Sequence, residues 1–307
     1  MDKFMEEVIA ELKDVMDESY SPVLVKARKN NEQVYNGIRF DQKGECVSPI
    51  IYVDELYQEY QSDRISMVDV VTLILDKLKE KEDVGKIVKE IQQYEMSKSK
   101  LKVALLNYSA NQEVLKERVH KPFLDLAIVP FVDVITEGGI DGLIFVTENL
   151  VEMWGVDKET ILEQGIQNMI DKERFFIASL DDILKGFMRS MAEEGMEIPA
   201  AKGGVYVISN EKKQYGAKIM LNSEFLHKVA IKHNSNLIIY PSSTHEIIVM
   251  VEEEHSGHIL RAEDVQLINE EGVRREEQLS NSVYYYDRER KEVFIREAGE
   301  PLCEDME

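Results

Sequence analysis

The hydrophobic positions of this chain repeat with two periods, which predict helices and strands in turn. Residues 2–18 place Phe4, Val8, Leu12 and Val15 on one face, as in an amphipathic helix. Shorter apolar runs bounded by Asn, Gly or Pro are typical of strands. Further helices are expected at 54–61, 66–79, 82–94, 111–119, 148–154, 157–169, 180–193, 223–233 and 263–277. Strands are expected at 22–29, 34–40, 47–53, 101–107, 123–135, 143–146, 205–209, 217–221, 236–240, 247–251, 283–287 and 292–296.

The order of these elements predicts the fold class. Strands follow one another in neighbouring pairs more often than they alternate with helices. This order favours an α+β fold with mixed or antiparallel sheets, paired strands and helical insertions. We expect an N-terminal α+β subdomain at 1–100, a central strand pair and helical region at 101–200, and a β-rich α+β subdomain at 201–307.

Charge is strong and unevenly distributed. The formal net charge of the 307 residues is -22, and residues 251–307 hold 17 acidic against 7 basic side chains. Residues 201–250 are mildly basic, with 6 basic against 3 acidic side chains. Solubility explains an acidic surface most simply, and imitation of nucleic-acid phosphate toward a DNA-binding partner is the alternative. Direct nucleic-acid binding is disfavoured because phosphate contacts need a clustered basic face.

The N-terminus and the cysteine content indicate a cytoplasmic protein. The charged start of the chain lacks the apolar core of a signal peptide, and no apolar run approaches the ~18 residues of a membrane span. Only Cys46 and Cys303 are present, which excludes a disulfide scaffold and favours a reducing compartment. We expect no membrane association. No phosphate-binding glycine motif occurs, so we also expect no cofactor.

Reactive side-chain types concentrate at residues 241–246, whose sequence is PSSTHE. This stretch, here called the polar turn, lies between two apolar, β-rich runs. Polar groups between two buried strands need hydrogen-bond partners or must face a site. The polar turn is therefore the first candidate for a pocket.

A catalytic interpretation makes Ser242 or Ser243 the nucleophile and His245 the base, with Glu246 or Asp125 to orient the base. Two observations oppose it. Adjacent residues of a strand point to opposite faces, and the chain has no G-x-S-x-G motif. We favour a packed turn whose hydroxyls bond nearby backbone.

Two other candidate groups carry weaker indications. His120, Asp125, His245 and Glu246 are of the right types for zinc or manganese, but no metal-binding spacing connects them, so we expect no metal site. Near the end of the chain, SNSVYYYDR puts Tyr284 and Tyr286 on one face of a strand and Tyr285 on the other. One of these faces is expected in the core, and the other is a candidate contact surface.

Five ordered stretches resemble a known family: IIYVDELYQEYQ, HKPFLDLAIV, VTENLVEMWGV, YPSSTHEIIVMVE and LSNSVYYYDRE. Together they resemble an uncharacterised clostridial family, a domain of unknown function whose members are often found on integrative and conjugative elements of gut Firmicutes. VTENLVEMWGV is also similar to part of another uncharacterised bacterial family. The resemblance implies one family-sized unit, and it transfers no catalytic role to any residue.

These observations favour a non-enzymatic interaction or regulatory protein of a mobile genetic element that acts on a protein partner. Such a protein could modulate host defence or imitate DNA. The alternative is a hydrolase, a metalloenzyme or a small-ligand sensor that uses a pocket around Ser242–Glu246.

Overall fold

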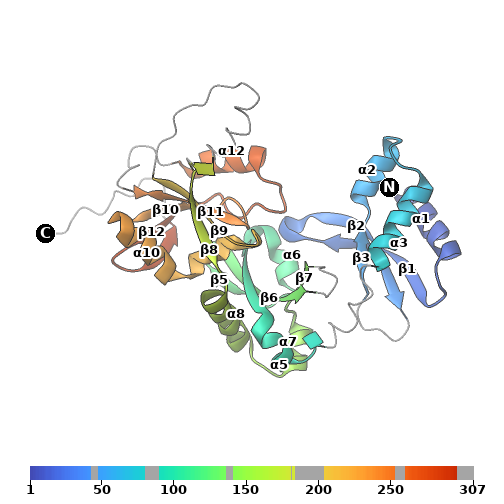
Figure 1. Ribbon diagram of the computed structural model, residues 1–307, viewed down its shortest axis with the longest axis horizontal. Helices are drawn as coiled ribbons and strands as arrows, with labels where there is room; N and C mark the ends of the chain where they lie inside the picture. Colours follow the sequence, from blue (N-terminus) through green and yellow to red (C-terminus); the bar gives the residue numbers. More distant parts are fainter. Residues whose placement is uncertain are drawn as a thin grey trace.

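Three antiparallel sheets and their covering helices make up the structure, which confirms the α+β prediction. The computed structural model describes residues 1–42, 48–79, 90–135, 141–180, 182–183, 204–252 and 260–295. Figure 1 shows one sheet with its helices set apart from the other two sheets. We call residues 1–79 the N-terminal lobe and the remainder the body.

The N-terminal lobe packs three helices on a three-stranded sheet of order β1-β2-β3. Its elements are α1 (Asp2–Val15), β1 (Tyr20–Arg28), β2 (Val34–Gln42), β3 (Ile50–Tyr52), α2 (Asp54–Gln61) and α3 (Met67–Lys79). The apolar stripe of α1 is buried, with Val8 and Leu12 fully covered by the same cluster that contains Phe40 and Ile74. The tip of the β1–β2 hairpin is a short 3-10 turn, η1 (Asn30–Glu32), which points toward the body (Figure 1).

The first half of the body is a four-stranded sheet. Its elements are α5 (Tyr94–Ser97), η2 (Lys98–Lys100), β4 (Leu101–Asn107), η3 (Ser109–Asn111), α6 (Gln112–Leu115), β5 (Lys121–Phe123), β6 (Leu126–Ile135), β7 (Asp141–Phe145), α7 (Glu148–Trp154) and α8 (Lys158–Lys172). Local signals set the helix ends as expected. Gly155 follows α7 with a φ of 64°, and Asp157 accepts a hydrogen bond from the Thr160 N–H at the start of α8.

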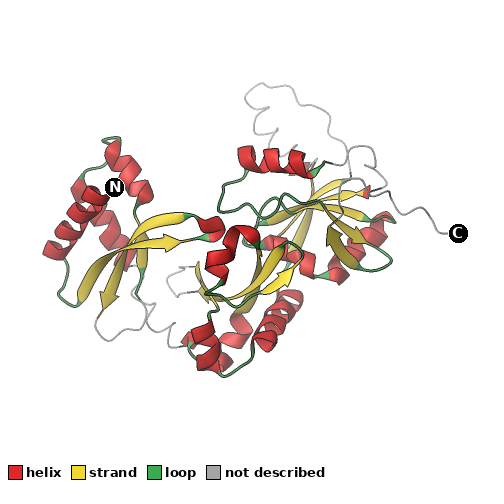
Figure 2. Cartoon of the chain, turned by 180° about the vertical axis from the view of Figure 1, so that it is seen from behind, coloured by secondary structure: helices red, strands yellow, loops and turns green. Residues whose placement is uncertain are grey.

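The second half of the body is a six-stranded sheet of order β13-β12-β10-β11-β9-β8. Its elements are β8 (Phe175–Ser179), β9 (Val205–Asn210), η4 (Gly216–Leu221), α10 (Ser223–His233), β10 (Leu237–Tyr240), β11 (Glu246–Val251), α12 (Ala262–Gly272), β12 (Tyr284–Asp287) and β13 (Glu292–Ile295). One hydrophobic cluster joins this sheet to the four-stranded sheet, so the body has a shared core. Figure 2 shows the two sheets side by side.

Several element predictions were wrong or incomplete. Residues 217–221 form the 3-10 helix η4 rather than a strand. The helix expected at 263–277 ends at Gly272, and the one expected at 111–119 shortens to α6. The strand β8 was not predicted.

Two expectations remain open. Most of the helix predicted at 82–94 lies outside the described residues, and so does most of the helix predicted at 180–193. The division into three subdomains stays a prediction. β8, which precedes residue 200, pairs with β9.

Within the described ranges, every helix falls short of the length and apolar character that crossing a membrane requires.

Candidate functional site

The polar turn connects β10 to β11 and lies against residues 274–281, which we call the linking segment. Main-chain hydrogen bonds join the two. The Thr244 N–H donates to the Glu277 carbonyl at 2.8 Å. The Leu279 N–H donates to the Ser242 carbonyl at 3.0 Å, and the Ser280 N–H to the Pro241 carbonyl at 3.0 Å. The turn is thus paired along its length.

His245 is held by its ring, its main chain and a carboxylate. Its Nδ1 accepts a hydrogen bond from the Tyr215 N–H at 3.3 Å, which in the neutral ring puts the proton on Nε2. That Nε2 lies 3.6 Å from Oε1 of Glu277. The His245 carbonyl accepts from Ser209 Oγ at 2.6 Å, and its N–H donates to Ser243 Oγ at 3.0 Å. This histidine therefore fixes the turn against β9, η4 and the linking segment.

Gly216 permits this close packing. A Cβ at Gly216 would lie 2.3 Å from the His245 carbonyl oxygen and 2.5 Å from Ser209 Oγ. Since real Cβ contacts are never this short, no residue other than glycine fits here without a shift of the polar turn.

Asp125 accepts hydrogen bonds from three hydroxyls of the C-terminal region. Ser280 Oγ donates at 2.7 Å and Ser282 Oγ at 3.0 Å, and the Tyr284 hydroxyl also donates to this carboxylate. Asp125 lies in the tight turn between β5 and β6, next to Leu124, which has a φ of 57°. Burial first, and then the charge of Asp125, raise the pKa of Tyr284 well above its ordinary value.

The sequence-predicted candidates separate into two groups. Asp125 and Tyr284 touch, and Ser243 and His245 touch. Ser242 contributes its carbonyl to the pairing with the linking segment.

Three candidates lie outside both groups. His120 Nδ1 lies 2.9 Å from the Arg118 carbonyl, and its ring contacts Tyr108. The Tyr286 hydroxyl donates to the Ser223 carbonyl at 3.1 Å. Glu246 is half-buried at the start of β11.

The alternative catalytic and metal arrangements considered from the sequence do not form in the described part of the chain. There, no hydrogen bond or ion pair joins His245 to Asp125 or to His120. No group of three His, Cys, Asp or Glu residues that could hold a metal ion occurs in the same part.

Side-chain amides hold the linking segment, and sequence reasoning missed them. Asn31 Nδ2 donates to the carbonyls of Arg275 at 2.6 Å and Gln278 at 2.7 Å. Asn107 Nδ2 donates to the Leu279 carbonyl at 2.8 Å. These bonds replace the ladder that a strand would supply. The asparagines are far from the segment in sequence, so no local pattern indicates the pairing.

The tip of the β1–β2 hairpin joins the N-terminal lobe to the body at the same place. Asn31 and Asn111 form a reciprocal pair: the Asn31 N–H donates to Asn111 Oδ1 at 2.7 Å, and Asn111 Nδ2 donates to Asn31 Oδ1 at 2.8 Å. Both asparagines are buried, and Asn31 has a φ of 54°. Glu32 Oε1 accepts from the Glu113 N–H at 3.0 Å. The hairpin tip therefore forms a buried, hydrogen-bonded contact between the N-terminal lobe and the body.

A buried ion pair was also missed. Lys218 is 1% exposed, and its Nζ lies 2.7 Å from Oε1 of Glu173. Burial lowers the pKa of Lys218, while the Glu173 carboxylate opposes that shift. Nearby, Lys102 pairs with Asp133 at 2.7 Å. Lys218 lies on η4, where the sequence pattern had indicated a strand.

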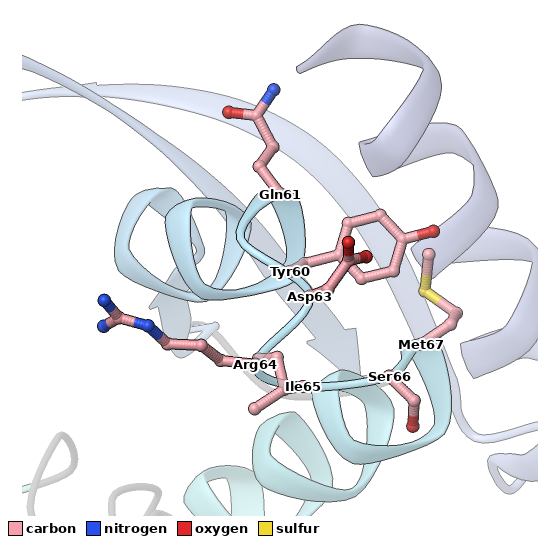
Figure 3. Close-up of a pocket in the computed structure, with 7 residues that line it drawn as sticks. All are labelled: Tyr60, Gln61, Asp63, Arg64, Ile65, Ser66 and Met67. Carbon is pink, nitrogen blue, oxygen red and sulfur yellow. The ribbon is translucent and has the colours of Figure 1, made fainter.

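Two surface hollows accompany these features. One, of about 570 Å³, lies at the α2–α3 turn, where Figure 3 shows Gln61, Arg64 and Ser66 pointing in different directions. The other, of about 440 Å³, lies where the hairpin tip meets the linking segment. It is lined by Asn31, Glu32, Asn107, Ser109, Ala110, Arg275, Gln278, Leu279, Ser280 and Asn281.

The polar groups of the candidate site thus serve internal contacts. The hydroxyls around Asp125 donate to its carboxylate, and the imidazole of His245 receives a backbone N–H. In a serine–histidine pair the serine hydroxyl donates to the imidazole, whereas Ser243 Oγ accepts from the His245 backbone N–H. Chemically, this arrangement ties β-strands, the linking segment and the N-terminal lobe together.

Comparison with known proteins identifies a family but no characterised relative. A search of the curated proteins and a search of the solved structures each found no match. The model of a family of unknown function, DUF5688, matches residues 1–288. Since this match spans most of the chain, the protein belongs to the DUF5688 family of unknown function.

Proposed function

We propose that this protein is a non-enzymatic interaction protein that acts by binding a protein partner. The observation that supports this most directly is that the polar groups of the polar turn make hydrogen bonds within the protein. His245 is hydrogen-bonded to Tyr215 and Ser209, the Ser243 hydroxyl accepts from the His245 N–H, and the backbone of the turn pairs with the linking segment. Side chains committed to such contacts hold surfaces in a fixed arrangement, which favours binding by a preorganised protein.

Surface composition supports a charged partner. The net charge is -22, and exposed apolar side chains such as Val68, Leu267 and Ile268 lie on helices that also carry carboxylates. Complementary charge accelerates association and selects partners. The proposal includes a cytoplasmic site of action, and it takes from the clostridial resemblance a regulatory role on a mobile genetic element.

Affinity capture at two salt concentrations, paired with a hydrolysis screen, tests the proposal. We expect the full-length protein to capture one partner from its own cells in a fixed ratio, and less of it at high salt. The screen uses ester, phosphoester and peptide substrates with wild type and His245→Ala. Turnover that disappears in a folded His245→Ala variant would establish an enzyme and overturn the proposal.

A second candidate function is small-ligand binding, supported by the polar hollow of about 440 Å³ at the hairpin tip. A ligand there would touch both the N-terminal lobe and the linking segment. A thermal-shift screen of polar metabolites should then give a stabilisation that Asn107→Ala reduces. Equal shifts in wild type and Asn107→Ala would remove this candidate.

A further inference from the structure

Among the residues that the structure describes, the contacts that hold helix α12 come from one side. Among its residues, Val265 and Asn269 are buried. Val265 packs with Ile238 and Tyr285 on the face of the six-stranded sheet opposite the shared core of the body. Asn269 Nδ2 donates to the Ser280 carbonyl at 3.1 Å. Figures 1 and 2 show α12 on the outside of that sheet.

Its last turn is fixed as well. Gln278 Nε2 donates to the Asn269 carbonyl at 2.8 Å and to the Val273 carbonyl at 3.0 Å. The Asn269 carbonyl also accepts from the Val273 N–H at 3.1 Å, so Gln278 adds a second bond there and a bond to the Val273 carbonyl just past the helix end. Helix α12 is therefore a rigid surface element, and a partner that docks on it pays little ordering cost.

The outward face of α12 presents apolar side chains. Leu267 is 58% exposed and Ile268 is 49% exposed. They are adjacent in sequence and lie about 100° apart around the helix. Leu267 lies nearly opposite Val265, whereas Ile268, three residues after Val265, lies beside the buried face. Water covers them in the isolated chain, which is unfavourable for two branched apolar side chains.

Carboxylates surround this apolar pair at helical spacing. Glu263, Glu270 and Glu271 stand four residues before, three after and four after Leu267. Residues three or four apart are neighbours on a helix surface. Asp264 and Glu271 flank Ile268 in the same way, although Asp264 also accepts from the Arg261 N–H at 3.0 Å. The surface is apolar at its centre and acidic at its rim.

We infer that α12 is the docking surface for a basic amphipathic helix of the partner protein. This inference rests on the proposed function and gives the partner its chemistry. Leucine-type side chains of the partner would cover Leu267 and Ile268, and its Lys or Arg side chains would face Glu263, Glu270 and Glu271. An apolar centre with a charged rim is the usual arrangement of a helix-in-surface interface.

A labelled synthetic helix of lysine and leucine, about five turns long, tests the inference by fluorescence anisotropy. We expect the full-length protein to bind it at least about tenfold more tightly than a scrambled peptide of the same composition. The double substitution Leu267→Ser, Ile268→Ser should weaken binding by about tenfold. A second variant, Glu270→Lys with Glu271→Lys, should also weaken it and reduce its salt dependence.

The matched control is Val68→Ser with Ile231→Ser, which removes two exposed apolar side chains on α3 and α10. This control should bind like wild type. Equal binding of both peptides, or unchanged binding by the α12 variants, would overturn the inference. A dimer of the protein alone that the Leu267→Ser, Ile268→Ser variant abolishes would also overturn it, because a second copy would then be the occupant.

The two proposals fail differently. Capture of the same cellular partner by wild type and by the Leu267→Ser, Ile268→Ser variant would overturn the α12 inference and leave the proposed function standing. Turnover that depends on His245 would overturn the proposed function itself.

Discussion

At the scale of single residues, Asp125 is the acceptor around which the C-terminal hydroxyls are arranged. Its carboxylate accepts hydrogen bonds from the hydroxyls of Ser280, Ser282 and Tyr284, although Ser280 is 155 residues away in sequence. Hydrogen bonds to an ionised acceptor are stronger than neutral ones, and a buried hydroxyl without its acceptor is costly.

Asp125→Ala should therefore lower the free energy of unfolding by about 3 kcal/mol, because buried hydroxyls lose their acceptor. Urea denaturation measures this. Asp171→Ala, at an exposed carboxylate on α8, should change it by less than about 0.5 kcal/mol. Equal effects of the two substitutions would mean that the Asp125 cluster adds nothing to stability.

Tyr240 gives a pH-dependent test. It is buried, its hydroxyl oxygen accepts from the Leu260 N–H at 3.1 Å, and burial raises its pKa to about 12. The folded state thus holds the phenol proton more tightly than the unfolded state, whose pKa is near 10.0. The stability that this proton preference supplies is complete below pH 10 and is lost as pH rises toward 12.

Relative to Tyr240→Phe, wild type should lose about 1 kcal/mol of unfolding free energy between pH 10 and pH 11. Denaturation of both proteins at a series of pH values measures the difference in unfolding free energy. The other tyrosines are the same in both proteins, so their contribution cancels. A difference that stays constant across this range would show that the phenol ionises equally in both states.

At the scale of elements, local patterns predicted those elements that local interactions determine. The bounds of α2, α7 and α10 match the expected ranges 54–61, 148–154 and 223–233, because each has an apolar stripe and recognisable ends. The strand β4 also matches.

Elements that depend on distant partners escaped prediction. Residues 217–221 look like a strand because they are nearly all apolar, yet η4 is shaped by contacts of Gly216 with His245 and of Lys218 with Glu173. The candidate site shows the same limit. Asp125 and Tyr284 stood out separately as polar groups beside apolar runs. The contact between them and the amide bonds of Asn31 and Asn107 depend on chain folding over long separations.

Gly216→Ala tests the packing of η4 on the polar turn. The added methyl would overlap the His245 carbonyl, so we expect a loss of about 1–3 kcal/mol in unfolding free energy. Gly272→Ala is the matched control, because a Cβ there meets nothing within 4 Å. Chemical denaturation of both variants gives the comparison, and a Gly216→Ala protein as stable as the control contradicts the close approach.

At the scale of the whole molecule, the contacts that the hairpin tip of the N-terminal lobe makes with the described part of the body are polar. Asn31 supplies most of them, with Glu32 and Asn30 adding bonds to Glu113 and Glu276. A buried polar contact of this kind stabilises the protein only while each of its donors and acceptors has a hydrogen-bond partner.

Asn31→Ala should therefore separate the two parts without unfolding either one. Small-angle scattering should show a larger radius of gyration, while circular dichroism stays unchanged. Gln33→Ala removes one bond within the hairpin tip, to the Asn31 carbonyl at 3.1 Å, and should leave the radius unchanged. An unaltered radius in Asn31→Ala would mean that other contacts fix the lobe.

The central claim is that the polar turn is a structural junction rather than an open reaction site. Hydrogen–deuterium exchange over residues 240–245 and 277–281 tests it most directly, because the amides of Thr244, Leu279 and Ser280 all donate to carbonyls of the opposite segment. We expect both peptides to exchange as slowly as those of the central strands. Exchange as fast as in an exposed turn would contradict the junction and reopen the polar turn as a site.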